Sequence, residues 1–386
     1  MNEQTQIKTL QIAAAVSFVL AIVNHLLPPG SYPATQLLFS YDFGFLRRGL
    51  TGELLSMILP GRVTVEQIRL VTFCMTLAGA VAFGVMAAKR LAGGVPQLLL
   101  LIIVFNSFAF TSFIGATGYL DSILMVLVVL ALAVPATSVA GLAVRTALLL
   151  LGALVHEIMV PYFLALIAFD IWLAESPARR WRAFLPVGAS VVIVLALFTK
   201  ANLDPALAEA FIDSVRARAG FVPDEVNLAV AGDALSAHQT FTAESQSSGA
   251  QRAMYMFDGV PLTLMALWIW WLGGKMIGEG REIDRLALLA VIAAPVTLNL
   301  VAIDVARFGA ASVLSGFLAL GIILLRVPGA RERLAEHFGL GHAMIVLVLN
   351  ANVFTMSFSS DAGHTAQAPW VWIVQRHWFE PAPPPE

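Results

Sequence analysis

The sequence predicts an all-α fold, a polytopic transmembrane helical bundle of about eleven spans. Of the 386 residues, 59% are hydrophobic and only 12% are charged, whereas soluble domains are about 45–50% apolar and about 25% charged. Apolar runs close to the roughly 20 residues that a spanning helix needs recur along the chain. When eleven spans are counted, the short connections that are rich in Lys and Arg all fall on the same side of the membrane. We therefore expect a single integral membrane domain over 1–386, and we exclude a soluble globular domain.

Composition also narrows the functional classes. The net charge of −2 implies no nucleic-acid partner. Cys74 is the only cysteine, which excludes an internal disulfide and a cysteine-rich metal site. The chain has no phosphate-binding Gly-rich loop, no His-Glu-x-x-His zinc helix and no nucleophile elbow. The sequence thus indicates no cofactor and no metal ligands. A requirement for a divalent metal ion stays possible, but no motif indicates it.

Eleven apolar segments are candidates for spans. The run from about Leu10 to Leu27 lacks a small-residue cleavage site, so it is expected to be retained as the first of them. Residues 140–174 are too long for one helix, and His156, Glu157 and Pro161 interrupt them, which favours two short helices. The predicted spans are 9–27, 68–88, 96–114, 119–135, 140–155, 158–174, 184–200, 257–274, 286–303, 309–325 and 342–358.

Orientation follows from the basic residues of the short loops. Lys89–Arg90, Arg179–Arg182, Lys275–Arg285 and Arg326–Arg333 all fall on one side of an eleven-span bundle. Short cytoplasmic loops carry an excess of Lys and Arg. We therefore predict a multi-pass protein of the bacterial inner (cytoplasmic) membrane, with the N-terminus inside and the C-terminus outside. Arg47 and Arg48 are the main exception, because they fall on the outer side. Their position therefore indicates a role other than setting the orientation.

Three outer segments are long enough to carry structure of their own. The first outer loop, 28–67, has apolar residues at helical spacing from Phe45, which predicts an interfacial helix. Thr64 and Gln67 at its end have the spacing of a capping box. A larger outer loop after span seven, 201–256, has helical tendency around 205–218. The outer C-terminal tail covers 359–386.

Ionisable residues from separate parts of the chain are predicted to meet at the outer face. Such groups are costly at membrane depth and usually face the bundle interior or a wet cavity. Each of these residues could instead have a purely structural role. Asp42 could stabilise a turn, Asp121 could cap a helix, and His156 and Glu157 could be a solvated loop pair. Asp304 and Arg307 could form a structural ion pair, and Arg47 and Arg48 could contact lipid headgroups. The residues expected to converge are Asp42, Asp121, His156, Glu157, Asp304 and Arg307.

The layout resembles the GT-C superfamily of membrane glycosyltransferases. Those enzymes have an inside N-terminus, a long first outer loop with a catalytic acidic residue and helices along the membrane, and often a large outer loop after span seven. Here the first loop contains Ser40-Tyr-Asp-Phe-Gly-Phe-Leu-Arg-Arg-Gly-Leu-Thr-Gly-Glu53, and the second loop is 201–256. The paired acidic residues of some members are absent, because Tyr41 and Phe43 flank Asp42.

The resemblance implies transfer of a sugar from a polyprenyl-phosphate donor to an envelope glycan or lipid acceptor at the outer face. Asp42 would be the catalytic base that accepts the proton of the acceptor hydroxyl. Arg47, Arg48 and Arg307 would bind the donor phosphate, since arginine matches phosphate oxygens with its fork. The remaining substrate-binding residues would be Tyr41, Asp121, His156, Glu157 and Asp304. The expected partners are the donor, the acceptor and membrane lipids.

Three other functions stay open. A transporter or lipid flippase would place polar residues near mid-membrane on broken helices. Such residues are few in the predicted spans: Asn106, Thr297, Asn299, Asn350 and Asn352. An O-antigen-type polymerase or ligase would also use outer-face arginines and histidines on lipid-linked glycans. A non-catalytic envelope scaffold is the third.

Overall fold

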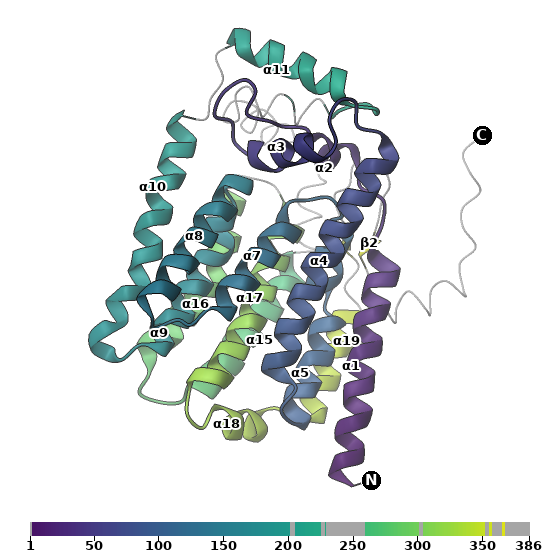
Figure 1. Cartoon of the computed structure of the whole chain (residues 1–386). Helices are drawn as coiled ribbons and strands as arrows, with labels where there is room; N and C mark the ends of the chain where they lie inside the picture. Colours follow the sequence, from purple (N-terminus) through teal and green to yellow (C-terminus); the bar gives the residue numbers. More distant parts are fainter. Residues whose placement is uncertain are drawn as a thin grey trace, which may run out of the picture.

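Helices make up almost all of the computed structural model of this chain, which describes residues 2–200, 205–224, 228, 259–300 and 304–351 and two short strands at 355–356 and 365–366. Most helices stand side by side in one bundle, and three short ones gather at its end (Figure 1). The bundle consists of α1 (Glu3–His25), α4 (Val65–Leu91), α5 (Val95–Phe105), α6 (Phe108–Gly115), α7 (Asp121–Ala133), α8 (Val139–Val155), η1 (Val160–Leu164), α9 (Ala165–Ala174), α10 (Phe184–Lys200), α15 (Val260–Ile277), α16 (Glu282–Val296), α17 (Val305–Arg326) and α19 (Leu340–Ala351). Connecting turns carry η2 (Pro177–Ala183), η4 (Thr297–Leu300) and α18 (Ala330–His337), and the two strands are β1 (Thr355–Met356) and β2 (Thr365–Ala366).

The chain is a helical membrane protein by the length and apolarity of its helices. Among the described residues, five helices suffice to cross a membrane, or six if α5 and α6, bent by 42° at their junction, form one broken span. Ten of the predicted spans coincide largely with helices where the structure describes them, whereas the last, 342–358, is helical only to Ala351 and also includes the strand β1. Residues 257–258, 301–303, 352–354 and 357–358 of the predicted spans lie outside the described residues. Helices such as α7, with 13 residues, are only about 20 Å long at roughly 1.5 Å per residue. The count of eleven spans therefore stays a prediction.

The segment 140–174 is divided as the sequence indicates. Helix α8 ends at Val155, and His156 takes an extended conformation. A π-helical turn that contains Pro161 then leads into α9. Proline cannot donate a backbone hydrogen bond, and π turns are one of the common causes of an irregular helix start. The break places His156 and Glu157 at the end of the bundle that carries the first loop.

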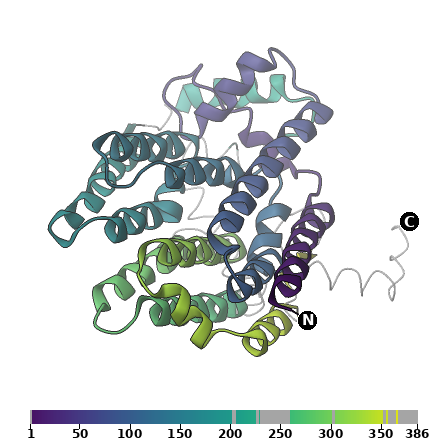
Figure 2. The ribbon, with the colours of Figure 1, turned by 60° about the horizontal axis from the view of Figure 1, so that its bottom comes forward.

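Helix α17 forms the centre of the bundle. Within its apolar segment, 94% of the residues are buried inside the protein, whereas the corresponding share for α1 is 11%. It packs against α15, α16, α6, α4 and α9. Gly309 and Gly316 make close packing possible, because a Cβ at either position would overlap Leu262 or Ile269 of α15. In Figure 2, α15 to α17 form one group of helices and α7 to α10 another.

The first outer loop folds over one end of the bundle, which we call the outer end. It contains α2 (Ser31–Gln36) and α3 (Gly49–Ile58), and α11 (Pro205–Arg218) lies across it (Figure 1). Val63 joins the two loops, since its N–H donates to Arg218 O and its carbonyl accepts from Gly220 N, both at 2.8 Å. The capping box of Thr64 and Gln67 is confirmed.

The interfacial helix begins later than predicted. Arg48 has φ 64°, in the left-handed region, and is the N-cap of α3. A helix cannot pass through that conformation, so the prediction of a start near Phe45 was wrong and α3 begins at Gly49. Leu54, Met57 and Ile58 are 51%, 69% and 73% exposed, which gives α3 an apolar surface suited to the membrane interface.

Reporter fusions test the predicted orientation. Fusions after Glu175 and after Arg333 are expected to read cytoplasmic, because both follow an even number of predicted spans in basic connections. A fusion after Gly363, which lies outside the described residues, is expected to read periplasmic. Paired alkaline phosphatase and fluorescent protein fusions measure this directly. A cytoplasmic signal at Gly363 would contradict the eleven-span count.

Candidate functional site

An arginine of the central helix binds two aspartates at the outer end. Arg307 donates to Asp121 through Nε at 2.6 Å and Nη2 at 3.0 Å, although 186 positions separate the two residues. Asp304, the N-cap of α17, accepts from the Arg307 backbone N–H at 3.3 Å and from Nη1 at 3.2 Å. The Asp121 side chain is 8% exposed and that of Asp304 is 30% exposed. The cluster therefore has two carboxylates and only one guanidinium. Of the two carboxylates, Asp304 is the more exposed and the more weakly bound.

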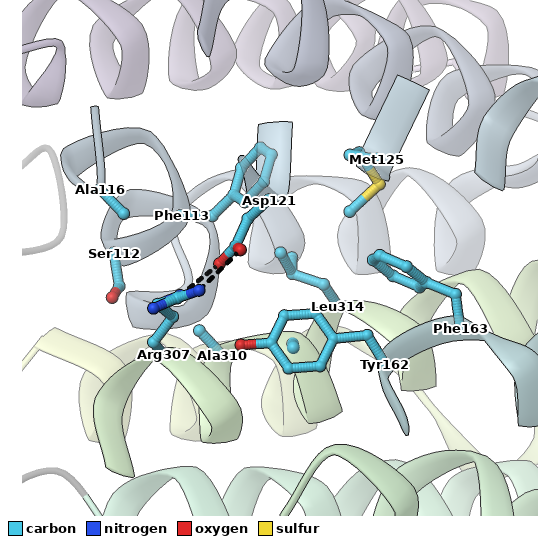
Figure 3. A pocket seen from close by; sticks show the side chains of 11 residues that line it. Ser112, Phe113, Ala116, Asp121, Met125, Tyr162, Phe163, Arg307, Ala310 and Leu314 are labelled. Carbon is cyan, nitrogen blue, oxygen red and sulfur yellow. Dashed lines mark hydrogen bonds and ion pairs between the residues drawn. The ribbon is translucent and has the colours of Figure 1, made fainter. Parts of the chain in front are cut away.

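Asp121 and Arg307 of this cluster also line a small cavity, whose lining side chains Figure 3 shows. It has room for about one water molecule. The Tyr162 hydroxyl points into it, toward the Arg307 guanidinium, with which it interacts. Tyr162 was not predicted as a site residue, because the sequence does not distinguish a functional tyrosine in an apolar run from one that only packs in the core. The lining residues are Ser112, Phe113, Ala116, Asp121, Met125, Tyr162, Phe163, Arg307, Ala310, Ala311 and Leu314.

A second buried ion pair ties the first outer loop to the bundle. Arg48 donates to the Glu157 carboxylate through Nε at 3.1 and 3.3 Å and through Nη2 at 2.6 Å. His156 Nδ1 lies 3.2 Å from the other oxygen of Glu157. The side chains of Arg48, Glu157 and His156 are 10%, 15% and 3% exposed. The pair fixes the loop in place, and it gives Arg48 a partner within the bundle.

Two tyrosines connect the clusters. Tyr119 lies under the Arg307 guanidinium, whose Cζ is 4.5 Å from the ring centroid. Tyr32 of α2 stacks on Tyr119 with centroids 6.0 Å apart, and it also interacts with Arg48. A continuous contact network therefore runs from Glu157 to Asp304. Neither tyrosine was predicted as a site residue, although Tyr119 stands two residues before Asp121 in the Gly-containing outer segment.

Burial and neighbouring charges shift the pKa values of this network. Burial is the largest single effect on Glu157 and raises its pKa, but the charges and hydrogen bonds of Arg48 and His156 together outweigh it and hold that pKa well below its usual range. Burial, assisted by the Arg48 charge, lowers the pKa of His156 to about 4. Burial raises the pKa of Asp304 against the opposing charge of Arg307. At neutral pH, His156 is therefore uncharged and Glu157 is ionised.

The depressed pKa of His156 predicts loss of stability in mild acid. The unfolded histidine titrates near 6.5, so the unfolded state gains a proton below that pH while the folded state does not gain it until about pH 4. Stability is complete above about pH 6.5 and decreases by up to about 1.4 kcal/mol for each pH unit in this window. Thermal unfolding of the solubilised protein from pH 8 to pH 4.5 measures this. His156→Asn should flatten the profile, whereas His342→Gln, at an exposed position, should leave it unchanged; equal slopes in all three proteins would contradict the assignment.

The remaining predicted residues lie on the first outer loop, away from the cavity. Asp42 is exposed and accepts a 2.7 Å hydrogen bond from Ser40 Oγ. The Tyr41 backbone N–H donates to Glu53 Oε2 at 3.0 Å, and its ring covers Gly49. Arg47 is partly exposed beside Arg48. Of the predicted site residues, the structure brings Arg48, Asp121, His156, Glu157, Asp304 and Arg307 together, and no contact in the described ranges joins Asp42 to them.

The comparisons with known proteins give no relative. No family model matches the chain, and no curated protein or solved structure is significantly similar to it. Within the described residues, no three His, Cys, Asp or Glu side chains gather as a group that could hold a metal ion.

Proposed function

We propose that this protein is a membrane glycosyltransferase of GT-C type, which transfers a sugar from a polyprenyl-phosphate donor to an envelope glycan or lipid acceptor at the outer face. The observation that supports it best is the network at the outer end of the bundle. Carboxylates, arginines and tyrosines from four separate segments meet there, directly beneath the first outer loop. Sugar hydroxyls suit carboxylates and aromatic rings, and a lipid phosphate suits arginine.

The place of the network fits a substrate that is mostly lipid. A polyprenyl-phosphate sugar keeps its chain in the membrane and its charged head at the interface. Helix α3 presents exposed apolar side chains beside the Arg48 pair, so an isoprenoid chain has an apolar surface to follow. The donor head would then lie between the first loop and the outer end of the bundle.

Asp42 is the proposed general base. It is an exposed carboxylate on the first outer loop, which is where the resembling superfamily keeps its base, and Ser40 orients it. It would accept the acceptor hydroxyl proton while the hydroxyl oxygen attacks the anomeric carbon and the bond to phosphate breaks. Asp304 is the alternative base, because it is the second of two carboxylates that share the single charge of Arg307. Burial also raises its pKa, which makes the carboxylate a better proton acceptor.

The arginines divide into two roles in this proposal. The guanidinium groups of Arg48 and Arg307 donate hydrogen bonds to carboxylates, so these arginines position Glu157 and Asp121. Arg47, on the partly exposed side of the loop, would take the donor phosphate. Asp121, His156 and Glu157 would then orient the network, and Asp304 would contact sugar hydroxyls if Asp42 is the base.

Variants of the two arginines should separate these roles. Arg47→Ala should raise the KM for the donor about 10- to 100-fold, because a charge-assisted contact is lost. Arg48→Ala should instead lower stability by about 3–5 kcal/mol, because it leaves Glu157 buried without its partner. Arg48→Gly should recover about 1 kcal/mol of that loss, since glycine takes the left-handed φ at little cost. Equal effects of Arg47→Ala and Arg48→Ala on the donor KM would contradict the division.

The direct test of the proposal is sugar transfer by purified protein in lipid vesicles. The assay supplies a set of radiolabelled polyprenyl-phosphate sugars with vesicle lipids and envelope glycans as acceptors. Transfer that depends on the outer-end network supports the enzyme. Movement of a fluorescent lipid-linked sugar across the bilayer without any transfer would replace the enzyme by a flippase.

One observation favours the transporter as second candidate. The span formed by α5 and α6 is bent by 42° near Asn106, and transporters bind substrates at broken helices. In this structure, however, Asn106 Nδ2 donates to Ser17 Oγ and to Ile102 O, both at 2.8 Å. These bonds satisfy the amide nitrogen within the protein, so the break resembles a packing feature more than a substrate site.

A further inference from the structure

A second group of buried charges lies at the opposite end of the bundle, which the sequence predicts to face the cytoplasm. Arg145 of α8 donates through Nη2 to Asp170 Oδ2 at 2.7 Å, and Arg326 of α17 donates through Nε to Asp170 Oδ1 at 3.1 Å. The side chains of Arg145 and Asp170 are both 0% exposed. Arg90 of α4 belongs to the same group, since its charge interacts with those of the other three residues. Four helices thus bring their charges to one point.

The charges of this group do not balance. Three guanidinium groups, which stay protonated in proteins, surround one carboxylate. The C-terminal end of α7 compensates part of the excess, because Arg90 donates to Leu132 O at 3.2 Å and Arg145 Nη2 donates to Val134 O at 2.6 Å. A helix C-terminus is equivalent to only about half a negative charge. More than one positive charge is therefore left over.

Two guanidinium nitrogens of the group also lack acceptors. Arg90 Nη1 and Arg145 Nη1 are buried, and neither makes a hydrogen bond to the described residues. Burying a charge without partners is strongly unfavourable. Other buried acidic residues near this end are occupied, since Glu175 binds Arg182 and Asp284 binds Arg180 and Arg281. The excess positive charge and the unused guanidinium nitrogens suit an anion with several acceptor oxygens.

We propose that Arg90, Arg145 and Arg326 form a phosphate-binding site at the predicted cytoplasmic face. The Arg326 side chain is 28% exposed and Arg90 is partly exposed, so these two side chains connect the buried Arg145 to the surface of the protein. Gly321 lets the stem of Arg90 lie flat on α17, because a Cβ there would be only 3.0 Å from Arg90 Cβ. This contact holds the guanidinium beside Arg326.

The same chemistry has two sources at this face. Basic pockets between membrane helices on the cytoplasmic side bind the headgroups of anionic lipids. A free phosphate from the cytoplasm would offer the same oxygens to the same forks. The site is separate from the outer-end network, so it does not depend on the proposed transferase activity.

Binding of defined anions to the purified full chain tests the site. Thermophoresis in neutral detergent micelles measures Kd for phosphatidylglycerol, for phosphatidylcholine and for inorganic phosphate. We expect saturable binding of phosphatidylglycerol and none of phosphatidylcholine. Arg90→Gln should weaken that binding about 10- to 100-fold, because it removes one charge-assisted contact. Lys89→Gln, which removes the same charge from the neighbouring exposed position, should bind as the unmodified protein does.

The stability of the same variants separates a binding site from a purely structural cluster. Arg90→Gln removes surplus charge, so without anion it should unfold at the same temperature as the unmodified protein or higher. Inorganic phosphate binding that Arg90→Gln abolishes would support the site with free phosphate as ligand. Undetectable binding of both anions, or equal binding by Arg90→Gln and Lys89→Gln, would overturn the proposal, as would a lower unfolding temperature of Arg90→Gln with unchanged anion binding.

Discussion

Replacing Asp42 with Asn should lower the turnover of sugar transfer by about 10²–10⁴-fold, the range that a general base typically contributes. The amide keeps the size of the carboxylate, and Ser40 can still donate its hydrogen bond, so the loop should keep its conformation. Asp42 is exposed on the loop surface, so folding and donor binding should be little affected. Initial rates with saturating donor in reconstituted vesicles measure the effect.

Asp304→Asn is the matched comparison for that experiment. Under the primary assignment it should raise the KM without a comparable loss of turnover, because Asp304 contacts substrate or orients Arg307. A large loss in Asp304→Asn together with full activity in Asp42→Asn would move the base to Asp304. Full activity in both variants would remove general-base catalysis by either carboxylate and would favour the flippase.

Replacing Asp170 with Asn should have a large effect on stability. Asp170 is the one carboxylate among three arginines, and its side chain is 0% exposed. Removing one partner of a buried pair costs about 3–5 kcal/mol, because the remaining charge is left uncompensated. Denaturation of the protein in neutral detergent, by heat or by denaturant, should show this loss.

Two further variants make that measurement specific. Asp213→Asn removes the partner of Arg216, a pair in which the Asp213 side chain is 79% exposed, so it should change stability by less than about 1 kcal/mol. Adding Arg145→Met to Asp170→Asn should recover part of the loss, because it removes the charge left without a partner. Identical stability of Asp170→Asn and the unmodified protein would show that the cluster does not hold the helices together.

Much of the helix layout follows from the sequence, because apolar length and local signals are read along the chain. The capping box at Thr64 and the break near Pro161 depend only on neighbouring residues, and both are where the sequence places them. The meeting of Asp304 and Arg307 was expected for the same reason, since they stand three apart. Polar residues inside apolar runs also identified most members of the outer-end network.

The partners across the bundle were not predictable in the same way. Nothing local in the sequence joins Arg48 to Glu157 or Arg307 to Asp121, because these pairs depend on which helix ends pack together. The left-handed conformation of Arg48 was missed, since propensity assigns that conformation to glycine. Arg145 and Asp170 did carry a signal: each is a charged residue inside a predicted span, and such residues almost always have a buried partner.

Helix α17 acts mechanically as a spacer of fixed length. Ion pairs hold it at both ends, through Arg307 to Asp121 and through Arg326 to Asp170, and lipid barely reaches its apolar surface. Sliding the helix along its axis by one residue would displace both arginines by roughly 1.5 Å and loosen both pairs together. A thicker or thinner bilayer would therefore tilt the peripheral helices first, while the depth of the outer network relative to the inner arginine cluster stayed constant.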